Sequence, residues 1–237
     1  MTQRKSRADR RVELIDAARR AMIQHGAEGV HLNQIAEEAG LTSGAVLYHY
    51  PDLRDLLIEA HHAGMERFYE QRVKKISGMA DPAQKLITTI RSGLPESPDD
   101  AGVRLLCELG GAAGRNRVYG TLLTTLYDRQ VAMYQMILEV GAAQGVFKLA
   151  GDSEQIARNL VALEDAYGYR IIARHHSIGP DEAVGLILDF ARMATGHPLK
   201  ETPAPPRPKA TRTTRTTRPR KSTGTADGST AQPQDAG

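Results

Sequence analysis

Two short helical segments joined by a tight turn restrict the fold of this chain more than any other feature. Residues 33–50 read NQIAEEAGLTSGAVLYHY, with apolar or small residues at spacings that let two helices pack nearly at right angles. Gly40 can take the left-handed conformation that ends the first helix, and Thr42 or Ser43 can cap the second. The pattern predicts a helix-turn-helix, whose second helix enters the major groove of DNA.

Helical periodicity continues along the chain, without an alternating strand pattern of useful length. We therefore predict an all-α protein of about nine helices. The first helix follows Ser6 and Asp9, which have capping-box spacing, and ends at Gly26. A long fourth helix is expected with Pro51 as an early position and an end near Gly78. The remaining helices are predicted near residues 82–93, 100–114, 116–144, 153–176 and 181–195.

The C-terminal segment has a different composition from the rest of the chain. From about residue 202 it is rich in Pro, Thr and Arg and almost free of apolar residues, so it cannot bury enough surface to offset the entropy of ordering. The predicted organisation is a basic N-terminal arm, a helix-turn-helix DNA-binding domain, a helical-bundle domain and a disordered basic tail. These four parts span residues 1–11, 12–57, 58–199 and 200–237.

Charge is divided unevenly along the chain. The net charge is +3, but residues 1–11 carry +4 and residues 200–237 carry +5, which leaves −6 in between. Basic ends favour a polyanionic partner, although a solvated tail would have the same composition. No apolar run approaches the roughly 20 residues that span a bilayer, and the N-terminus lacks a signal-peptide pattern, so a cytoplasmic protein is expected. Cys107 is the one cysteine, which excludes intrachain disulfides and multi-cysteine metal sites.

The second helix of the motif begins with small residues. Ser43, Gly44 and Ala45 would let the backbone approach bases and phosphates, and a helix N-terminus favours an anion. Tyr48 and His49 lie one turn further on, where they could meet the sugar-phosphate backbone. The alternative is an αα-hairpin that merely packs, with the two tyrosines of YHY in its core.

A longer pattern surrounds this motif: an alanine-rich first helix, Gly26 and Gly29, Ala39-Gly40-Leu41, the YHYP segment and Leu56-Leu57. In order and spacing, this part of the chain, from about Val12 to Leu57, resembles the N-terminal domain of the TetR family of transcriptional regulators. The downstream segment GAAQGVFKLAGDSEQIARNLVALEDAYGYRII is similar to the ligand-binding half of the branch that contains the choline-responsive BetI-type repressors.

The resemblance implies which residues contact DNA and where this chain departs from the family. Many members have a tyrosine in place of Leu47 and a lysine in place of Leu53. We expect the missing phosphate contact to come from Arg54, or from the arm that includes Arg4 and Arg7. The implied base and phosphate contacts are Asn33, Thr42, Ser43, Gly44, Ala45, Tyr48 and His49.

The resemblance also implies that residues 58–199 are the ligand-binding and dimerisation domain. In the implied homodimer, the last two helices form a four-helix bundle across a twofold axis. Both helices offer apolar residues at three-and-four spacing, but an intramolecular core face would have the same pattern. The candidate dimer residues are Ile156, Leu160, Leu163, Tyr167, Ile171, Val184, Ile187, Leu188, Ala191 and Ala194.

Carboxylates and tyrosines occur within otherwise apolar stretches of the C-terminal helices. A buried carboxylate is costly unless it is paired, so it forms a salt bridge, for example with Arg104 or Arg170, or it awaits a cation. We favour pairing, and keep a cationic amine, quaternary ammonium or polyamine as the leading effector hypothesis. The candidate ligand-binding residues are Arg104, Glu108, Tyr119, Tyr127, Tyr134, Glu164, Asp165 and Tyr169.

The expected function is that of a transcriptional repressor that binds a palindromic double-stranded DNA operator as a homodimer and is released by a small-molecule effector. The rival hypothesis is an architectural protein that binds DNA without sequence preference. No P-loop, dinucleotide fingerprint, HExxH or GxSxG motif is present, so we expect neither catalysis nor a cofactor. The pairs His61-His62 and His175-His176 point about 100° apart on a helix, so no metal site is expected.

Overall fold

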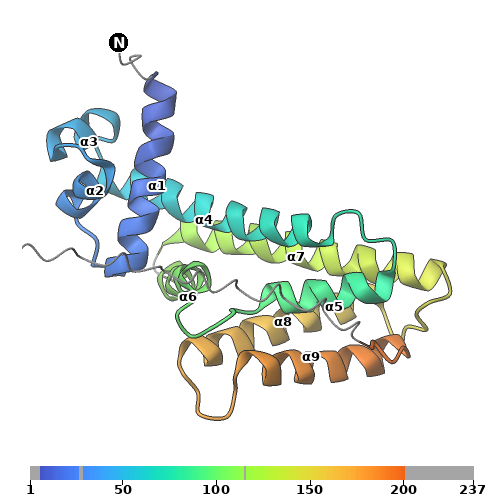
Figure 1. Ribbon diagram of the computed structural model, residues 1–237. Coiled ribbons are helices and arrows are strands. Elements are labelled where there is room, and N and C mark those ends of the chain that lie inside the picture. The colour runs from blue at the N-terminus through green and yellow to red at the C-terminus, as the bar shows by residue number, and fades with distance from the viewer. Residues whose placement is uncertain (1–5, 27–28, 115, 201–237) are drawn as a thin grey trace, which may run out of the picture. The chain divides into compact units, whose positions relative to one another are not determined.

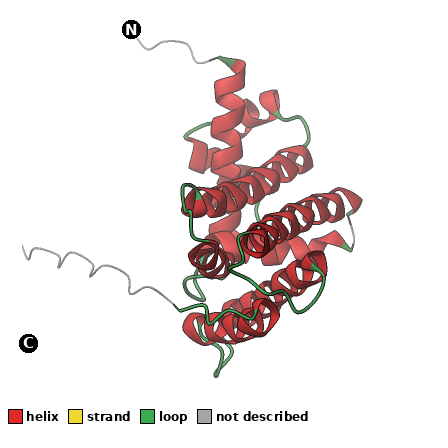
Figure 2. Cartoon of the chain, turned by 90° about the vertical axis from the view of Figure 1, so that its right-hand side faces the viewer, coloured by secondary structure: helices red, strands yellow, loops and turns green. Residues whose placement is uncertain are grey.

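The computed structural model describes residues 6–26, 29–114 and 116–200, and this part of the chain consists of helices and loops without a strand (Figure 2). The prediction of an all-α protein of about nine helices is confirmed. The nine helices of the described part, shown in Figure 1, are α1 (Arg7–His25), α2 (Leu32–Ala39), α3 (Ser43–His49), α4 (Leu53–Ile76), α5 (Pro82–Gly93), α6 (Ala101–Ala113), α7 (Arg117–Ala143), α8 (Ser153–Ile172) and α9 (Pro180–Thr195).

Local capping signals set most helix ends. The Ser6 hydroxyl accepts a hydrogen bond from the Asp9 amide at 3.0 Å, and the Ser6 amide donates to Asp9 at 3.2 Å, so the predicted capping box is present. Gly40 ends α2 in the left-handed conformation, with φ at 64°. The Thr42 hydroxyl accepts from the Ala45 amide, so Thr42 and not Ser43 caps α3.

The helix α1 begins at Arg7, directly after its predicted cap Ser6, so residues 7–11 of the basic arm are helical. Two other predicted helix bounds were wrong. The N-cap of α4 is Asp52, whose carboxylate accepts from the Arg54 amide at 2.8 Å, and Pro51 therefore precedes the helix. The helix α8 ends at Ile172 and not near residue 176, because the chain turns at Arg174, where φ is 56°.

The first three helices surround a small core of their own. Leu14, Ala18 and Met22 of α1 are buried against Ile35 of α2 and Val46 of α3. Leu105 of α6 is buried in this same core, with 3% of its surface exposed. The helix-turn-helix therefore packs on α6 as well as on α4, to which it is joined in sequence.

The C-terminal helices form a second core. Figure 1 shows α4 and α7 running side by side, and α8 packs on both α7 and α9. Eight of the ten predicted dimer residues are buried here within one chain: Ile156, Leu160, Ile171, Val184, Ile187, Leu188, Ala191 and Ala194. Leu163 and Tyr167 are partly buried against the same core. For the eight buried side chains the assignment to a dimer face was wrong and the alternative of an intramolecular core face is correct, because they pack inside the chain.

In the described ranges, no helix is long and apolar enough to cross a bilayer. The predicted disordered tail from residue 201 onward, like Arg4, lies outside the described residues.

Candidate functional site

The helix α3 is attached to the protein along one side and is open to solvent along the others. Val46 is fully buried, whereas Leu47 is 40% exposed and Tyr48 is 73% exposed. Val46 and the buried Tyr50 therefore anchor the helix, and Tyr48 points away from the core. The alternative of a merely packing hairpin placed both tyrosines in the core, and it is wrong for Tyr48.

The N-terminal end of α3 is open and locally braced. The Ser43 hydroxyl donates to the Asn33 side-chain oxygen at 2.6 Å, which ties α3 to α2 between two of the predicted DNA-contact residues. A side chain added at Gly44 would meet no atom within 4 Å, so the backbone at this turn faces open space. Thr42 is exposed, and Ala45 is partly exposed beside it. A large surface can therefore approach this end of the helix.

Three side chains from different helices hold the end of α3 in place. Tyr50 donates its hydroxyl hydrogen bond to Glu59 at 2.5 Å, and burial, followed by this bond, raises the pKa of Tyr50. Arg11 donates to Glu59 at 2.6 Å and to the His49 carbonyl at 3.3 Å, and its guanidinium lies 4.1 Å from the centre of the Tyr50 ring. Arg11 therefore braces the helix-turn-helix and is not free to act as part of a DNA-binding arm.

The other candidate phosphate contacts differ in exposure. Arg7 is exposed in the first turn of α1, and His49 is half-buried. Arg54 is exposed near Tyr119 of α7: burial raises the pKa of Tyr119, and the positive charge of Arg54 partly offsets that rise. Leu53, which stands where many relatives have lysine, packs on the helix-turn-helix core.

A cavity of about 610 Å³ lies among the C-terminal helices, with residues of α4, α5, α6, α7 and α8 in its wall. Four of the eight predicted ligand-binding residues line it: Tyr127, Glu164, Asp165 and Tyr169. Its apolar wall was not predicted and includes Phe68, Leu106, Leu123 and Leu126.

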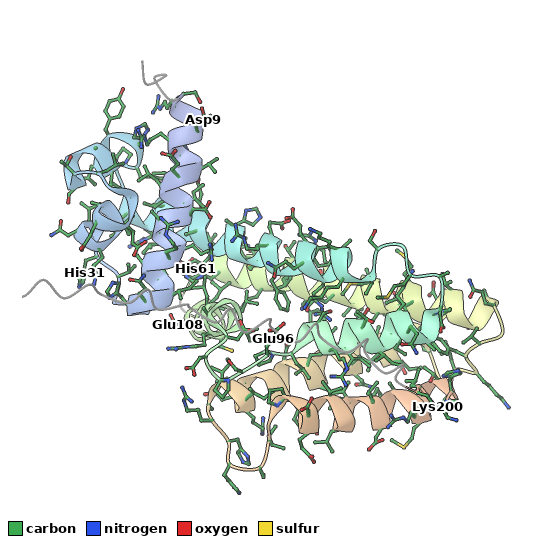
Figure 3. The ribbon with its side chains drawn as sticks, in the orientation of Figure 1. Asp9, His31, His61, Glu96, Glu108 and Lys200 are labelled. Atoms are coloured by element: carbon green, nitrogen blue, oxygen red, sulfur yellow. The ribbon has the colours of Figure 1, made fainter. Side chains whose placement is uncertain are left out.

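The other four predicted ligand-binding residues lie elsewhere. Arg104 and Glu108 line a second hollow, between α6 and the end of α8. Figure 3 shows Glu108 beneath the C-terminal end of α1, and a side chain added at Gly26 would lie 3.9 Å from its carboxylate. Tyr119 packs edge-on against His61, with ring centres 5.0 Å apart. Tyr134 is fully buried and does not line the cavity, although its hydroxyl donates a hydrogen bond to Glu164 of the cavity wall.

Glu164 of the cavity wall belongs to a buried ion pair. Glu164 of α8 accepts a hydrogen bond from Arg72 of α4 at 2.8 Å, and the two side chains are 2% and 1% exposed. Arg72 also donates to the Thr89 carbonyl at 3.1 Å and to Gln130. The predicted pairing of a buried carboxylate is confirmed for Glu164, but Arg72 is the partner and not Arg104 or Arg170.

Arg72 was missed although its spacing was informative. It follows Met65 and Phe68 at three-and-four spacing and precedes Ile76, so it occupies the inner face of α4. Only its charge argued against an inner position. Burial raises the pKa of Glu164 from 4.5 to about 7, although the positive charge of Arg72 acts in the opposite direction.

No cluster of three or more metal-ligating side chains occurs within the described ranges. The His175 and His176 rings stack on each other with centres 4.6 Å apart. Both residues follow the end of α8, so the prediction that this pair lies on a helix was wrong.

The helix α3 is exposed and packs on a three-helix core, and a helical bundle with an internal cavity follows it. These features define a helix-turn-helix protein with a cavity large enough for a small ligand. Residues 14–60 match the family model described as bacterial regulatory proteins, tetR family. Residues 14–60 therefore form an N-terminal domain of the TetR type.

One curated relative is an uncharacterized HTH-type transcriptional regulator of Mycobacterium tuberculosis, 35% identical over 82 residues. That match covers 34% of this chain and 40% of the relative, so the chain spans less than half the length of the curated relatives it matches. The family model and these relatives are described as transcriptional regulators.

Solved structures are similar over most of the described part. A transcriptional regulator from Saccharomonospora viridis in complex with choline has a TM-score of 0.72 at 23% identity, over 79% of this chain and 98% of that one. A TetR transcription regulator from Haloarcula marismortui has a TM-score of 0.71 at 22% identity, over 79% of this chain and 99% of that one. At these identities the likeness shows the fold. Similarity to the BetI-type branch stays a prediction.

Proposed function

We propose that this protein is a homodimeric transcriptional repressor that binds a palindromic operator in double-stranded DNA and is released by a small-molecule effector. The observation that carries the proposal is the exposure of α3, from the open turn at Gly44 to Tyr48, which is 73% exposed. A short helix with a free outer face and small residues at its start can enter the major groove.

Individual contacts follow from this placement. The amides at the start of α3 and the Thr42 and Ser43 hydroxyls are suited to phosphate and base edges. Tyr48 is suited to the sugar-phosphate backbone. Arg7 and Arg54 are the exposed cations near this surface, and we assign them to phosphate contacts, with Asn33 and His49 at its margins.

Dimerisation through α8 and α9 is supported by exposed apolar residues that sequence analysis did not select. Ala162 and Ala166 lie one turn apart on the outer face of α8. On α9, Leu186 is 36% exposed and Met193 is 72% exposed, with the half-buried Phe190 between them. Apolar stripes with this spacing are suited to a helical interface between two copies. A dimer would present two α3 helices to the two halves of a palindrome.

The effector is proposed to be a cationic amine, and the cavity chemistry supports this class. The described cavity wall contains the carboxylates of Glu164 and Asp165 and the rings of Tyr127 and Tyr169, and it contains no Lys, Arg or His. Aromatic faces and carboxylates both attract cations. The neighbour from Saccharomonospora viridis was solved with choline, which is a quaternary ammonium cation and shares the positive charge but not the N–H group of a protonated amine.

Release of the protein from DNA would depend on a movement of α4. This helix follows α3 directly, its residue Phe68 lines the cavity, and Arg72 joins it to Glu164 in the cavity wall. An effector that binds more tightly to one position of α4 than to another shifts the balance between the two, and the spacing of the two α3 helices changes with it.

A footprint of the full chain on the DNA that flanks its own gene tests the proposal. We expect protection of an inverted repeat, with half-sites about one helical turn or a multiple of it apart. Equal affinity for a scrambled duplex would contradict the repressor and favour the architectural protein, whose binding is governed by salt and not by sequence.

A further inference from the structure

One oxygen of the Glu164 carboxylate has no hydrogen-bond partner among the described residues. Its Oε1 atom accepts hydrogen bonds from Arg72 at 2.8 Å and from the Tyr134 hydroxyl, whereas Oε2 accepts none. The side chain is 2% exposed and lines the 610 Å³ cavity. A buried acceptor without a partner is destabilising, so a ligand that donates a hydrogen bond to it gains affinity.

Gly93 at the end of α5 allows the carboxylate to occupy this place. A Cβ atom at position 93 would lie 2.0 Å from Oε1 and 2.4 Å from Oε2 of Glu164. Both residues belong to the cavity wall. Glu164 is therefore held from three sides, by Arg72, Tyr134 and the bare backbone of Gly93, and its position is fixed before a ligand arrives.

The charges around this oxygen favour a positively charged donor. Arg72 neutralises Glu164, so the buried pair contributes little net charge. Asp165, on the exposed side of the same helix, adds a negative charge to the cavity wall, and no basic side chain is among the described lining residues. The ring of Phe68 and the side chain of Leu106 offer an apolar surface for the carbon skeleton of a ligand.

We propose that the cavity selects a protonated amine that carries at least one N–H group, and that Glu164 Oε2 accepts a hydrogen bond from it. This inference rests on the proposed function, because it names the effector class of the same cavity, but it concerns ligand binding and can be measured without DNA. A quaternary ammonium ion has the same charge and no N–H group, so it leaves Oε2 unpaired.

Isothermal titration of the full-length protein with three probes of equal chain length separates charge from hydrogen-bond donation. The probes are n-hexylammonium, N,N,N-trimethylhexylammonium and hexan-1-ol. We expect hexylammonium to bind at least about tenfold more tightly than either of the others, because it alone combines a hydrogen-bond donor with a positive charge. The trimethyl compound lacks the donor, and the alcohol lacks the charge.

Glu164→Gln tests the assigned acceptor, because it removes the carboxylate and preserves the side-chain size. We expect the preference for hexylammonium over the trimethyl compound to fall below about threefold. Glu70→Gln, at an exposed position of α4, is the matched control and should leave the preference unchanged. If Glu164→Gln does not fold, the double variant Arg72→Met/Glu164→Met removes the whole ion pair and is titrated in its place.

Each outcome bears on the inference. Equal or tighter binding of the trimethyl compound, equal binding of hexan-1-ol, a preference that survives loss of the carboxylate, or no binding of any probe would each overturn it. If the amine does not bind selectively but the protein still protects an inverted repeat, only the amine site is contradicted and the repressor proposal is not. Selective amine binding without any sequence-specific footprint would instead remove the proposed function and keep the amine site.

Discussion

Arg72 on α4 and Glu164 on α8 form an ion pair across 92 residues of sequence, with 2.8 Å between Nη2 and Oε1. Both side chains are almost completely buried, at 1% and 2% exposure. The pair joins the helix that follows the helix-turn-helix to the wall of the cavity. It is therefore a contact through which a change at the cavity wall can reach α4.

Loss of one member of this pair should be more harmful than loss of both. Arg72→Met leaves a buried carboxylate without its partner, and we expect a decrease in the free energy of unfolding of about 3–5 kcal/mol. The double variant Arg72→Met/Glu164→Met should recover most of this loss, because no charge is left buried. Urea denaturation of wild type, both single variants and the double variant measures the coupling. A single variant as stable as the wild type would show that the pair contributes nothing.

Tyr48→Ala should weaken operator binding and leave stability unchanged. The side chain is 73% exposed and makes no core contact, so its loss should alter the free energy of unfolding by less than about 0.5 kcal/mol. The variant loses one contact with the DNA sugar-phosphate backbone in each of two half-sites, which should lower operator affinity by about tenfold or more.

The matched control for this experiment is Met136→Ala on α7, which is 66% exposed and distant in sequence from α3. Fluorescence anisotropy with the footprinted duplex gives the affinity of both variants. Wild-type affinity of Tyr48→Ala would show that α3 does not contact DNA as proposed.

Stability should fall in acid partly because of His61. Burial against Tyr119 lowers the pKa of His61 from 6.5 to about 4, so the unfolded chain binds a proton in a pH range where the folded chain does not. The folded state is therefore favoured fully above pH 6.5, and up to about 3 kcal/mol of stability is lost as the pH falls towards 4. Other groups titrate in the same range. The contribution of His61 is therefore measured as the difference in the free energy of unfolding between the wild type and a variant without this histidine.

Thermal or urea unfolding of His61→Leu at several pH values isolates this contribution. The variant should lose less stability than the wild type between pH 6.5 and 4. Parallel pH profiles of the two proteins would mean that His61 titrates normally in the folded state.

Met193→Asp should dissociate the proposed dimer. Met193 is 72% exposed on α9, and a carboxylate facing its own copy across a twofold axis would be repelled and desolvated. Met136→Asp, on a similarly exposed residue of α7, is the control and should stay dimeric. Light scattering coupled to size exclusion gives the mass of each. A dimeric Met193→Asp protein would move the interface away from this part of α9.

Most of the fold was predictable because the signals for it are local. Ser6 with Asp9 marks the start of α1, and Gly40 the end of α2, through hydrogen bonds within a few residues. Predicted helix bounds were wrong where no local signal marks the end of a helix. The helix α8 ends at Ile172, and Arg174 takes a positive φ although the sequence offers no glycine there. Tyr48 could likewise be predicted to face outwards, because residues two apart on a helix, such as Val46 and Tyr48, point in different directions.

The tertiary structure decided which residues meet. Periodicity shows that a helix face is apolar but not which surface covers it, so the faces of α8 and α9 containing Leu160 and Ile187 were assigned to a second copy and are covered by their own chain. The partner of Glu164 could not be found from spacing, because Arg72 lies on a helix that reaches it only after the bundle has assembled. The sequence by itself determined the helices and the exposed recognition motif, and packing determined the buried charges and the cavity, since burial is a property of the whole assembly of helices.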